Sequence, residues 1–263
     1  MKSMEKLCAS IQMLSSWLAA SDTAALTKEG LEKLPEPEAV ILFGGSTLQG
    51  AHTLKMAGDC FPKAKIILVG GYGHTTSLLE EQMKKVLQTW PDKKLCEAVL
   101  FEQYIKEQFG LEADFLECRS TNCGNNVTLL LELLKEKLPG CRRIAVIQDP
   151  SMQRRMKAVF EKEAPNLEIV SIPAMLPVFC YDEKEIRFQT ETPGQWSIEK
   201  YCQLLCGEIP RLRNDAEGYG PNGAGFIAAV EIPDEIEEAW QIVMNSDYGQ
   251  ARTADSAYAS DKA

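Results

Sequence analysis

Residues that could bind a small ligand recur at four places in the sequence, each directly after a short apolar run. Glycine lets a backbone approach a ligand closely, and hydroxyl and amide side chains can hydrogen-bond to it. The four groups are Gly44, Gly45, Ser46 and Thr47; Gly70, Gly71, Gly73, His74, Thr75 and Thr76; Ser120, Thr121, Asn122 and Asn125; and Asp149, Pro150, Gln153 and Arg154. Either glycine pair alone could serve only a tight turn with positive φ, but together the groups predict a ligand site.

The fourth group contains a local conflict. Asp149 suits a helix N-cap and Pro150 the first helical position, so the sequence predicts a helix that begins there. Arg154 and Arg155 then lie near the positive end of that helix, which disfavours a cation by about 0.3–1 kcal/mol unless an anion compensates. We therefore expect Arg154 to contact an anionic part of a ligand. An arginine that is solvated or paired with an acid is the alternative, above all for Arg155.

Three side chains could transfer protons in a reaction at such a site: His74, Glu97 and Asp149. Each also has an ordinary structural interpretation. A loop histidine can bond to backbone, Glu97 can be an acid in the first turn of a helix, and Asp149 can be the cap described above. Asn122 or Asn125 could likewise cap the helix that follows.

The glycine loops do not form a dinucleotide-binding fingerprint. In the run from Gly71 to Thr76, threonine stands where the third glycine would be, and no acidic residue closes the next strand. This disfavours an ordinary nicotinamide-dependent oxidoreductase.

The elements that must position these loops follow from the apolar pattern. Continuous apolar runs without alternation indicate strands buried on both faces, as in a parallel sheet. We expect strands at 39–43, 66–69, 115–116, 144–147 and 167–172, and helices at 4–20, 53–61, 78–90, 96–109, 127–138, 152–163, 198–205 and 234–244. The alternation predicts an α/β protein with an open, mainly parallel Rossmann-like sheet, helices on both faces, and an added helical and loop C-terminal region. The four loops would then face one crevice at the strand C-termini.

We expect three regions along the chain. Residues 1–37 form an N-terminal helix and connection, residues 38–245 form the α/β domain with its C-terminal extension, and residues 246–263 form a flexible polar tail.

Composition excludes several classes of protein. The 263 residues carry 28 basic and 38 acidic side chains, a net charge of −10, which disfavours a nucleic-acid partner. No apolar stretch approaches the roughly 18 residues of a membrane span, and polar residues interrupt the N-terminal apolar positions. Nine cysteines without a C-x-x-C pair indicate reduced thiols and a cytoplasmic location. Only two histidines are present, so we expect no metal site.

Several longer motifs resemble the YdcF-like family, also called the ElyC/SanA/YdcF group. They are VGGYGHTT at 69–76, STNCGNN at 120–126, QDPSMQRR at 148–155 and GEIPRLRNDAEGYGPNG at 207–223, with WLA at 17–19. The resemblance covers nearly the whole chain. It implies a parallel-sheet fold and binding of S-adenosyl-methionine, without an established methyltransferase activity. Broader relatives place a histidine in the loop after the fourth strand, where this chain has none.

By motif position, the resemblance implies a set of ligand-facing residues. They are Gly44, Gly45, Ser46, Gly71, Gly73, His74, Glu97, Thr121, Asn122, Asn125, Asp149, Gln153 and Arg154.

We therefore expect a protein that binds a small anionic or nucleotide-like molecule, S-adenosyl-methionine or a relative, at the strand C-termini. The alternative is an enzyme, a transferase or hydrolase, acting on a phosphorylated or nucleotide-linked substrate, with Arg154 neutralising the anion. A third hypothesis is that the protein has a purely structural role as a scaffold. The sequence leaves the reaction and the oligomeric state open.

Overall fold

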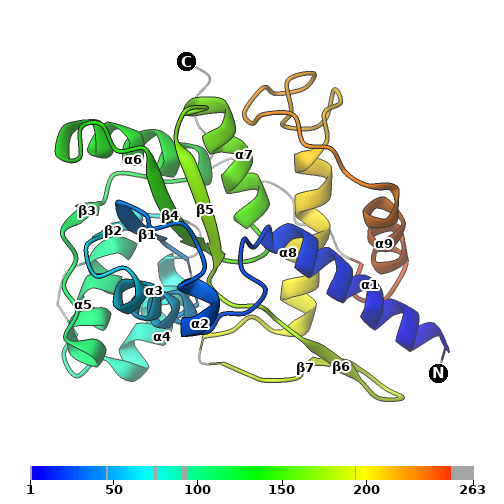
Figure 1. The fold of residues 1–263 in the computed structure, drawn as a ribbon. Coiled ribbons are helices and arrows are strands. Elements are labelled where there is room, and N and C mark those ends of the chain that lie inside the picture. The colour runs from blue at the N-terminus through cyan, green and yellow to red at the C-terminus, as the bar shows by residue number, and fades with distance from the viewer. Residues whose placement is uncertain (1, 46, 74–75, 91–93, 193, 250–263) are drawn as a thin grey trace.

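The computed structural model describes residues 2–45, 47–73, 76–90, 94–192 and 194–249. Its centre is a five-stranded, all-parallel sheet with the order β3-β2-β1-β4-β5. The strands are β1 (Ala39–Phe43), β2 (Lys65–Val69), β3 (Phe115–Glu117), β4 (Arg143–Gln148) and β5 (Glu168–Pro173). Figure 1 shows the sheet between layers of helices, which confirms the expected open α/β architecture.

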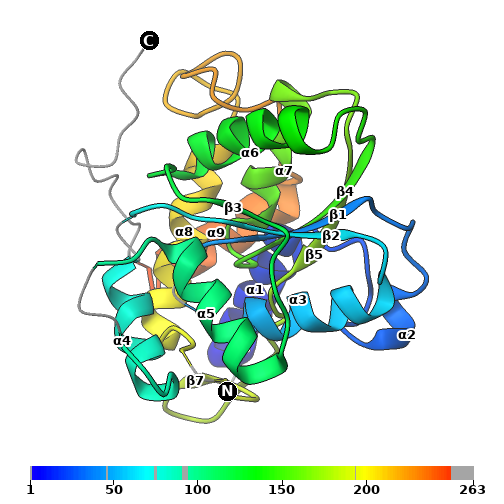
Figure 2. The same ribbon diagram turned by 90° about the vertical axis from the view of Figure 1, so that its left-hand side faces the viewer.

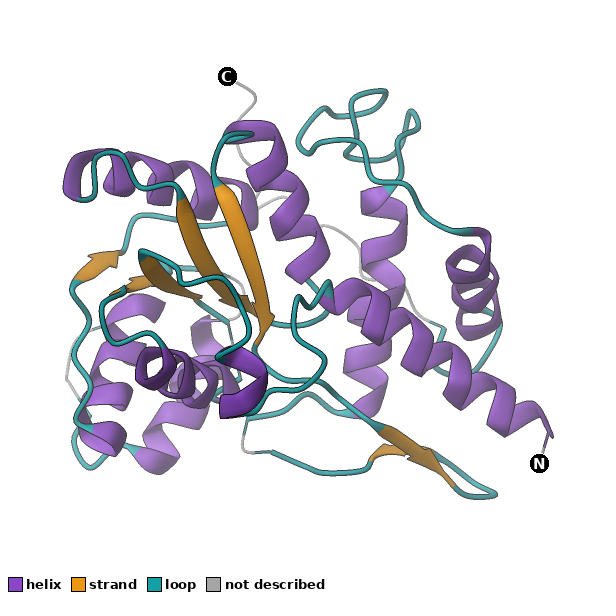
Figure 3. Ribbon diagram, in the orientation of Figure 1, coloured by secondary structure: helices purple, strands orange, loops and turns teal. Residues whose placement is uncertain are grey.

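Helices cover both faces of the sheet (Figures 2 and 3). One layer consists of α2 (Lys28–Leu31), α3 (Gln49–Cys60), α4 (Thr76–Val86) and α5 (Glu97–Phe109). The other consists of α1 (Lys2–Ala19), α6 (Cys123–Lys137), α7 (Gln153–Glu163), α8 (Ile198–Leu212) and α9 (Asp234–Met244).

Successive residues of each strand point into two different cores. In β1, Val40 and Leu42 pack toward α3 and α5, whereas Ile41 and Phe43 pack toward α6 and α7. The Phe43 ring meets the edge of Phe160 on α7, with ring centroids 6.2 Å apart. Burial on both faces explains why these strands are apolar without alternation.

The N-terminal helix is part of this packing. Ile11, Leu14 and Leu18 of α1 have no exposed surface and belong to the same core as α7, α8 and α9. Within the described part of the chain, no helix has the length and apolarity to cross a bilayer.

The structure differs from the sequence expectation in several local details. Helix α7 begins at Gln153, because residues 149–152 form a turn in which Met152 N donates to Asp149 O (2.9 Å). The stretch after β5 contains an antiparallel hairpin of β6 (Phe179–Tyr181) and β7 (Ile186–Phe188), where a loop was expected. Helix α4 ends at Val86 instead of Trp90, and α8 extends to Leu212. Most of the expected polar tail, residues 250–263, lies outside the described residues.

Strand order also determines where a ligand can enter. The chain runs from β1 outward to β2 and β3, then returns to the other side of β1 with β4 and β5. At such a switch point the loops after β1 and β4 diverge to opposite faces and leave a crevice beyond the strand C-termini.

Candidate functional site

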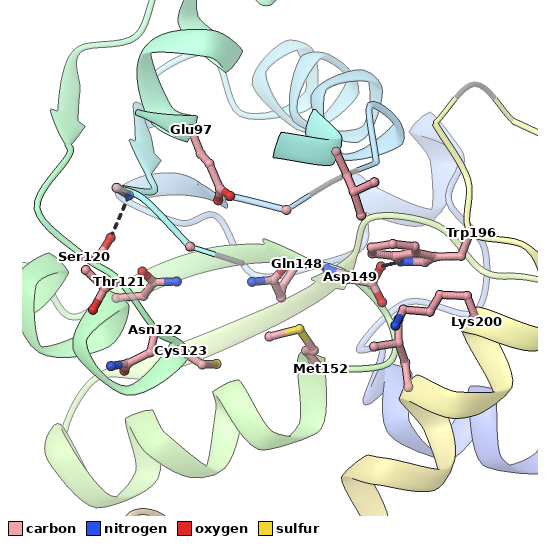
Figure 4. A pocket seen from close by; sticks show the side chains of 17 residues that line it. Glu97, Ser120, Thr121, Asn122, Cys123, Gln148, Asp149, Met152, Trp196 and Lys200 are labelled. Atoms are coloured by element: carbon pink, nitrogen blue, oxygen red, sulfur yellow. Dashed lines mark hydrogen bonds between the residues drawn. The ribbon is translucent and has the colours of Figure 1, made fainter. Parts of the chain in front are cut away.

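A pocket lies at this switch point (Figure 4). The space between its walls, including the open mouth, is about 870 Å³. Its lining residues are Gly44, Gly45, Gly71, Gly73, Leu78, Glu97, Ser120, Thr121, Asn122, Cys123, Asn126, Gln148, Asp149, Met152, Trp196, Lys200 and Leu204. Loops after four strands therefore converge on one cavity, with the start of α5 and the start of α8 completing the wall.

The glycines in these loops make room for other groups. A Cβ atom on Gly70 would lie 2.9 Å from Glu97 Cβ and 3.1 Å from Gly44 Cα, and one on Gly44 would overlap the Glu97 carboxylate. A Cβ on Gly71 would overlap the backbone of Ser120. None of these three glycines has a positive φ, so close approach, and not turn geometry, is what requires glycine here.

Glu97 is the first residue of α5, and its carboxylate points into the pocket (Figure 4). Only 6 % of its surface is exposed. Thr76 Oγ1 donates to Glu97 Oε1 (2.8 Å) and accepts from Gly73 N (2.8 Å), so the carboxylate is tied to the loop after β2. The helix N-terminus favours the negative charge at this position.

Asp149 forms the opposite side of the pocket and is almost fully buried. Its Oδ1 accepts from Ser151 Oγ (2.6 Å) and Ser151 N (2.9 Å), and its Oδ2 accepts from Trp196 Nε1 (3.1 Å). Burial raises the pKa of the Asp149 carboxyl, against the hydrogen bonds from Ser151 and Trp196, which lower it. The carboxyl therefore fixes the turn after β4 and the indole of Trp196.

Trp196 and Lys200 were not predicted from the sequence. Trp196 precedes α8, and Lys200 lies in the first turn of that helix, whose N-cap Ser197 accepts from Lys200 N (3.2 Å). Both side chains face the pocket beside Asp149 (Figure 4). Among the described lining residues, Lys200 carries the only basic side chain. The sequence signal that could have identified both residues is a tryptophan directly before a helix N-cap serine, with a lysine in the first turn of that helix.

Asn122 and Asn125 form a reciprocal capping box at the start of α6. Asn125 N donates to Asn122 Oδ1 (3.0 Å), and Asn122 N donates to Asn125 Oδ1 (3.0 Å). Asn125 Oδ1 also accepts from Thr121 N (2.9 Å). Asn122 lines the pocket, whereas Asn125 serves the cap and is not among the lining residues.

Two residues expected to face the ligand are directed elsewhere. Gln153 is fully buried, and its Nε2 donates to Val146 O and Ser171 Oγ (2.9 Å each), which braces α7 against the sheet. Arg154 Nε donates to Trp17 O (2.7 Å), and its guanidinium lies over the Trp17 ring, 4.1 Å from the centroid. Neither residue lines the pocket.

Arg155 follows the alternative interpretation, pairing with an acid. Its Nε lies 2.5 Å from Glu208 Oε2 and its Nη2 3.1 Å from Oε1, in a buried pair between α7 and α8. The neighbouring carboxylate raises the pKa of Arg155, although burial opposes this.

Of the expected ligand-facing residues, the structure brings together Gly44, Gly45, Gly71, Gly73, Glu97, Thr121, Asn122 and Asp149. Ser46 and His74 lie outside the described residues. Where side chains are described, no cluster of three or more potential metal ligands occurs. No protein-family model matches the chain.

Proposed function

We propose that the pocket binds an adenosyl ligand with a positive charge, and that S-adenosyl-methionine is the best candidate. The observation that carries the proposal is the charge pattern of the described lining. Glu97 faces the cavity from one side, while Lys200 and the Trp196 ring face it from the other. No arginine contributes to this described wall.

Each of these groups matches a part of the candidate ligand. A buried carboxylate such as Glu97 accepts hydrogen bonds from ribose hydroxyls or from an ammonium group. Lys200 suits the carboxylate of the methionine part. Trp196 can stack on a purine or lie against the sulfonium, as aromatic rings do with cations.

The same wall is poorly suited to a phosphate-rich ligand. The capping box occupies the N–H groups of Asn122 and Asn125 at the start of α6, so these two donors do not serve an anion. Arg154 and Arg155 are engaged with Trp17 and Glu208. Among the described lining residues, a triphosphate would meet the carboxylate of Glu97 with only one basic side chain, Lys200, to balance its charge. The sequence predicts a ligand that is either anionic or nucleotide-like. Of these two, the charge pattern favours the nucleotide-like molecule.

Other considerations support the same proposal. The motifs that resemble the YdcF-like family imply S-adenosyl-methionine, and most of them lie in the loops that line this pocket. We also propose a cytoplasmic location, which rests on the nine cysteines without a C-x-x-C pair in the sequence.

The alternative function is an enzyme that acts on a phosphorylated or nucleotide-linked substrate. The raised pKa of Asp149 is the feature that favours it, because a protonated carboxyl can act as a general acid. However, both Asp149 oxygens already accept hydrogen bonds from Ser151 and Trp196. This arrangement supports a structural role for Asp149 more than a catalytic one.

Calorimetric titration with a matched set of ligands tests the proposal. We expect S-adenosyl-methionine to bind at least tenfold more tightly than ATP, and S-adenosyl-homocysteine to bind with intermediate affinity because it lacks the sulfonium charge. Tighter binding of ATP than of S-adenosyl-methionine would contradict the charge argument. No heat with any adenosyl ligand at millimolar concentration would refute the ligand class.

A further inference from the structure

Gln148 is a buried polar residue in the pocket wall to which no role has yet been given. It is the last residue of β4, and only 2 % of it is exposed. Its side chain lies on the face of the sheet where Ile144 and Val146 of the same strand enter the core beneath α6 and α7. A buried amide at the ligand-facing end of an otherwise apolar strand needs hydrogen-bond partners.

The oxygen of the Gln148 carboxamide is already used within the protein. Asp149 N donates to Gln148 Oε1 (2.7 Å), and the Gln148 backbone oxygen accepts from Ala174 N (2.8 Å). The first of these bonds fixes the orientation of the carboxamide, because a flipped group would place its NH2 against the N–H of Asp149. The nitrogen, Nε2, is therefore the end that points away from Asp149.

This nitrogen faces the ligand space. Figure 4 shows it directed into the cavity, on the side of Asp149 that leads toward Thr121 and Asn122. Nε2 carries two hydrogens, and it has no acceptor among the residues that the structure describes. A buried donor without an acceptor costs free energy, so this amide gains a partner when a ligand supplies one.

Gln153 shows the other use of a buried glutamine in the same region. Its Nε2 donates to Val146 O and Ser171 Oγ, and the residue does not line the pocket. Gln148 and Gln153 are similarly buried, yet only Gln148 presents its nitrogen to the cavity. The contrast distinguishes a residue that braces the fold from one that is available to a ligand.

We infer that Gln148 is a specificity-determining residue whose Nε2 donates a hydrogen bond to a lone pair of the bound ligand. An amide NH2 can only donate, so it selects a ligand with a ring nitrogen or a carboxylate oxygen at this point and rejects one with an N–H there. S-adenosyl-methionine carries both kinds of acceptor, in its adenine ring and in its methionine carboxylate. The identity of the ligand rests on the proposed function, whereas the donor role of Gln148 does not.

NMR of the side-chain amides in the wild-type protein tests this donor directly. The Gln148 signal is assigned by its loss from the spectrum of Gln148→Glu. With S-adenosyl-methionine we expect that signal to shift and its hydrogens to exchange more slowly with water, because they become bonded to the ligand. An unchanged Gln148 signal, while the backbone amides of Glu97 and Thr121 shift, would overturn the inference and leave the proposed function intact.

Adenosine and methionine, added separately, identify the acceptor. A shift of the Gln148 signal with adenosine assigns the acceptor to the nucleoside, and a shift with methionine assigns it to the carboxylate. If S-adenosyl-methionine shifts none of the pocket signals, the proposed function fails, and the same two probes still decide the inference. A shift of the Gln148 signal by either probe then supports it, and no shift by either probe overturns it.

The affinity of Gln148→Glu for S-adenosyl-methionine provides a second test. Glutamate keeps the oxygen that accepts from Asp149 N and replaces the NH2 group with an acceptor. The added negative charge by itself attracts a positively charged ligand, so weaker binding reports the lost donor. We expect a dissociation constant roughly threefold to tenfold higher in calorimetry, and no change for Gln82→Glu, which adds the same charge on α4 outside the pocket lining. Equal or tighter binding by a folded Gln148→Glu protein would overturn the inference.

Discussion

Asp149 is a buried carboxyl whose two oxygens are both used within the protein. Burial raises its pKa, so the ionised form is disfavoured in the folded state relative to the unfolded chain, where an aspartate has a pKa near 3.9. Stability linked to this group is therefore fully present below about pH 4 and is lost as pH rises through the higher folded pKa.

The raised pKa of Asp149 predicts how the stability of one variant changes with pH. Relative to wild type, Asp149→Asn should become progressively more stable as pH rises from about 4 to 7, by about 1.4 kcal/mol for each unit by which the folded pKa is raised. Urea unfolding at pH 4, 5.5 and 7 measures the difference. If the wild type instead becomes more stable relative to the variant as pH rises, the folded protein stabilises Asp149 as the anion.

At the residue scale, the sequence predicted which glycine loops form the site better than it predicted which charged side chains face it. A glycine directly after a strand indicates that another group packs closely against the backbone there. Gly44 and Gly71 could therefore be identified from the sequence. The Arg154 side chain points away from the pocket because it binds Trp17, which is distant in the sequence, and because a turn places the start of α7 at Gln153. Lys200 comes from an element beyond the sheet, whose docking no local pattern indicates.

The glycine segment between α5 and the loop after β3 sets the spacing of one pocket wall. An added Cβ on Gly71 would lie 2.8 Å from Cys118 O as well as overlapping Ser120. Backbone atoms cannot move aside as a flexible side chain can, so the segment tolerates no larger residue without rearrangement.

Gly71→Ala should therefore destabilise the protein by about 1–3 kcal/mol in urea unfolding. Gly58→Ala is the matched control, because Gly58 lies inside α3 and its added Cβ would make ordinary contact with Ile66 Cδ1 at 3.4 Å. That helical substitution should be neutral or stabilising by about 0.4–1 kcal/mol. Equal effects of the two changes would mean that the close approach at Gly71 is not a constraint.

Among the elements, the strands were predicted well because burial on both faces leaves an unambiguous apolar run, as in β1 and β4. Helix ends were less certain. Asp149 and Pro150 have the residue types of a helix start, yet the Asp149 side chain bonds to Ser151 and forms a separate turn. The hairpin of β6 and β7 has only three residues in each strand, too few for a recognisable pattern.

The whole molecule depends on the docking of α8, which carries one wall of the pocket. The buried pair of Arg155 and Glu208 joins α7 to α8, and Trp240 Nε1 of α9 donates to Cys206 O (3.0 Å). The C-terminal region and the sheet are thereby held as one unit. Sequence periodicity predicted these helices but could not show which charged residues would meet.

Removing one partner of the buried pair should be costly. Glu208→Gln leaves the buried Arg155 charge without its carboxylate, so we expect a loss of about 3–5 kcal/mol in the free energy of unfolding. Glu237→Gln, in the more exposed pair with Arg213, should cost less than about 1 kcal/mol. Similar losses in both variants would mean that burial of the Arg155 pair has no special role in holding α8.

The affinity of Glu97→Gln for S-adenosyl-methionine tests the central claim most directly. Glutamine keeps the oxygen that accepts from Thr76 but removes the negative charge, and Glu102→Gln is the control on the same helix outside the pocket. A charge-assisted contact contributes about 1.5–3 kcal/mol, so calorimetry should give a dissociation constant roughly tenfold to a hundredfold higher for Glu97→Gln and an unchanged value for Glu102→Gln. A folded Glu97→Gln protein that binds the ligand as tightly as wild type would contradict the account.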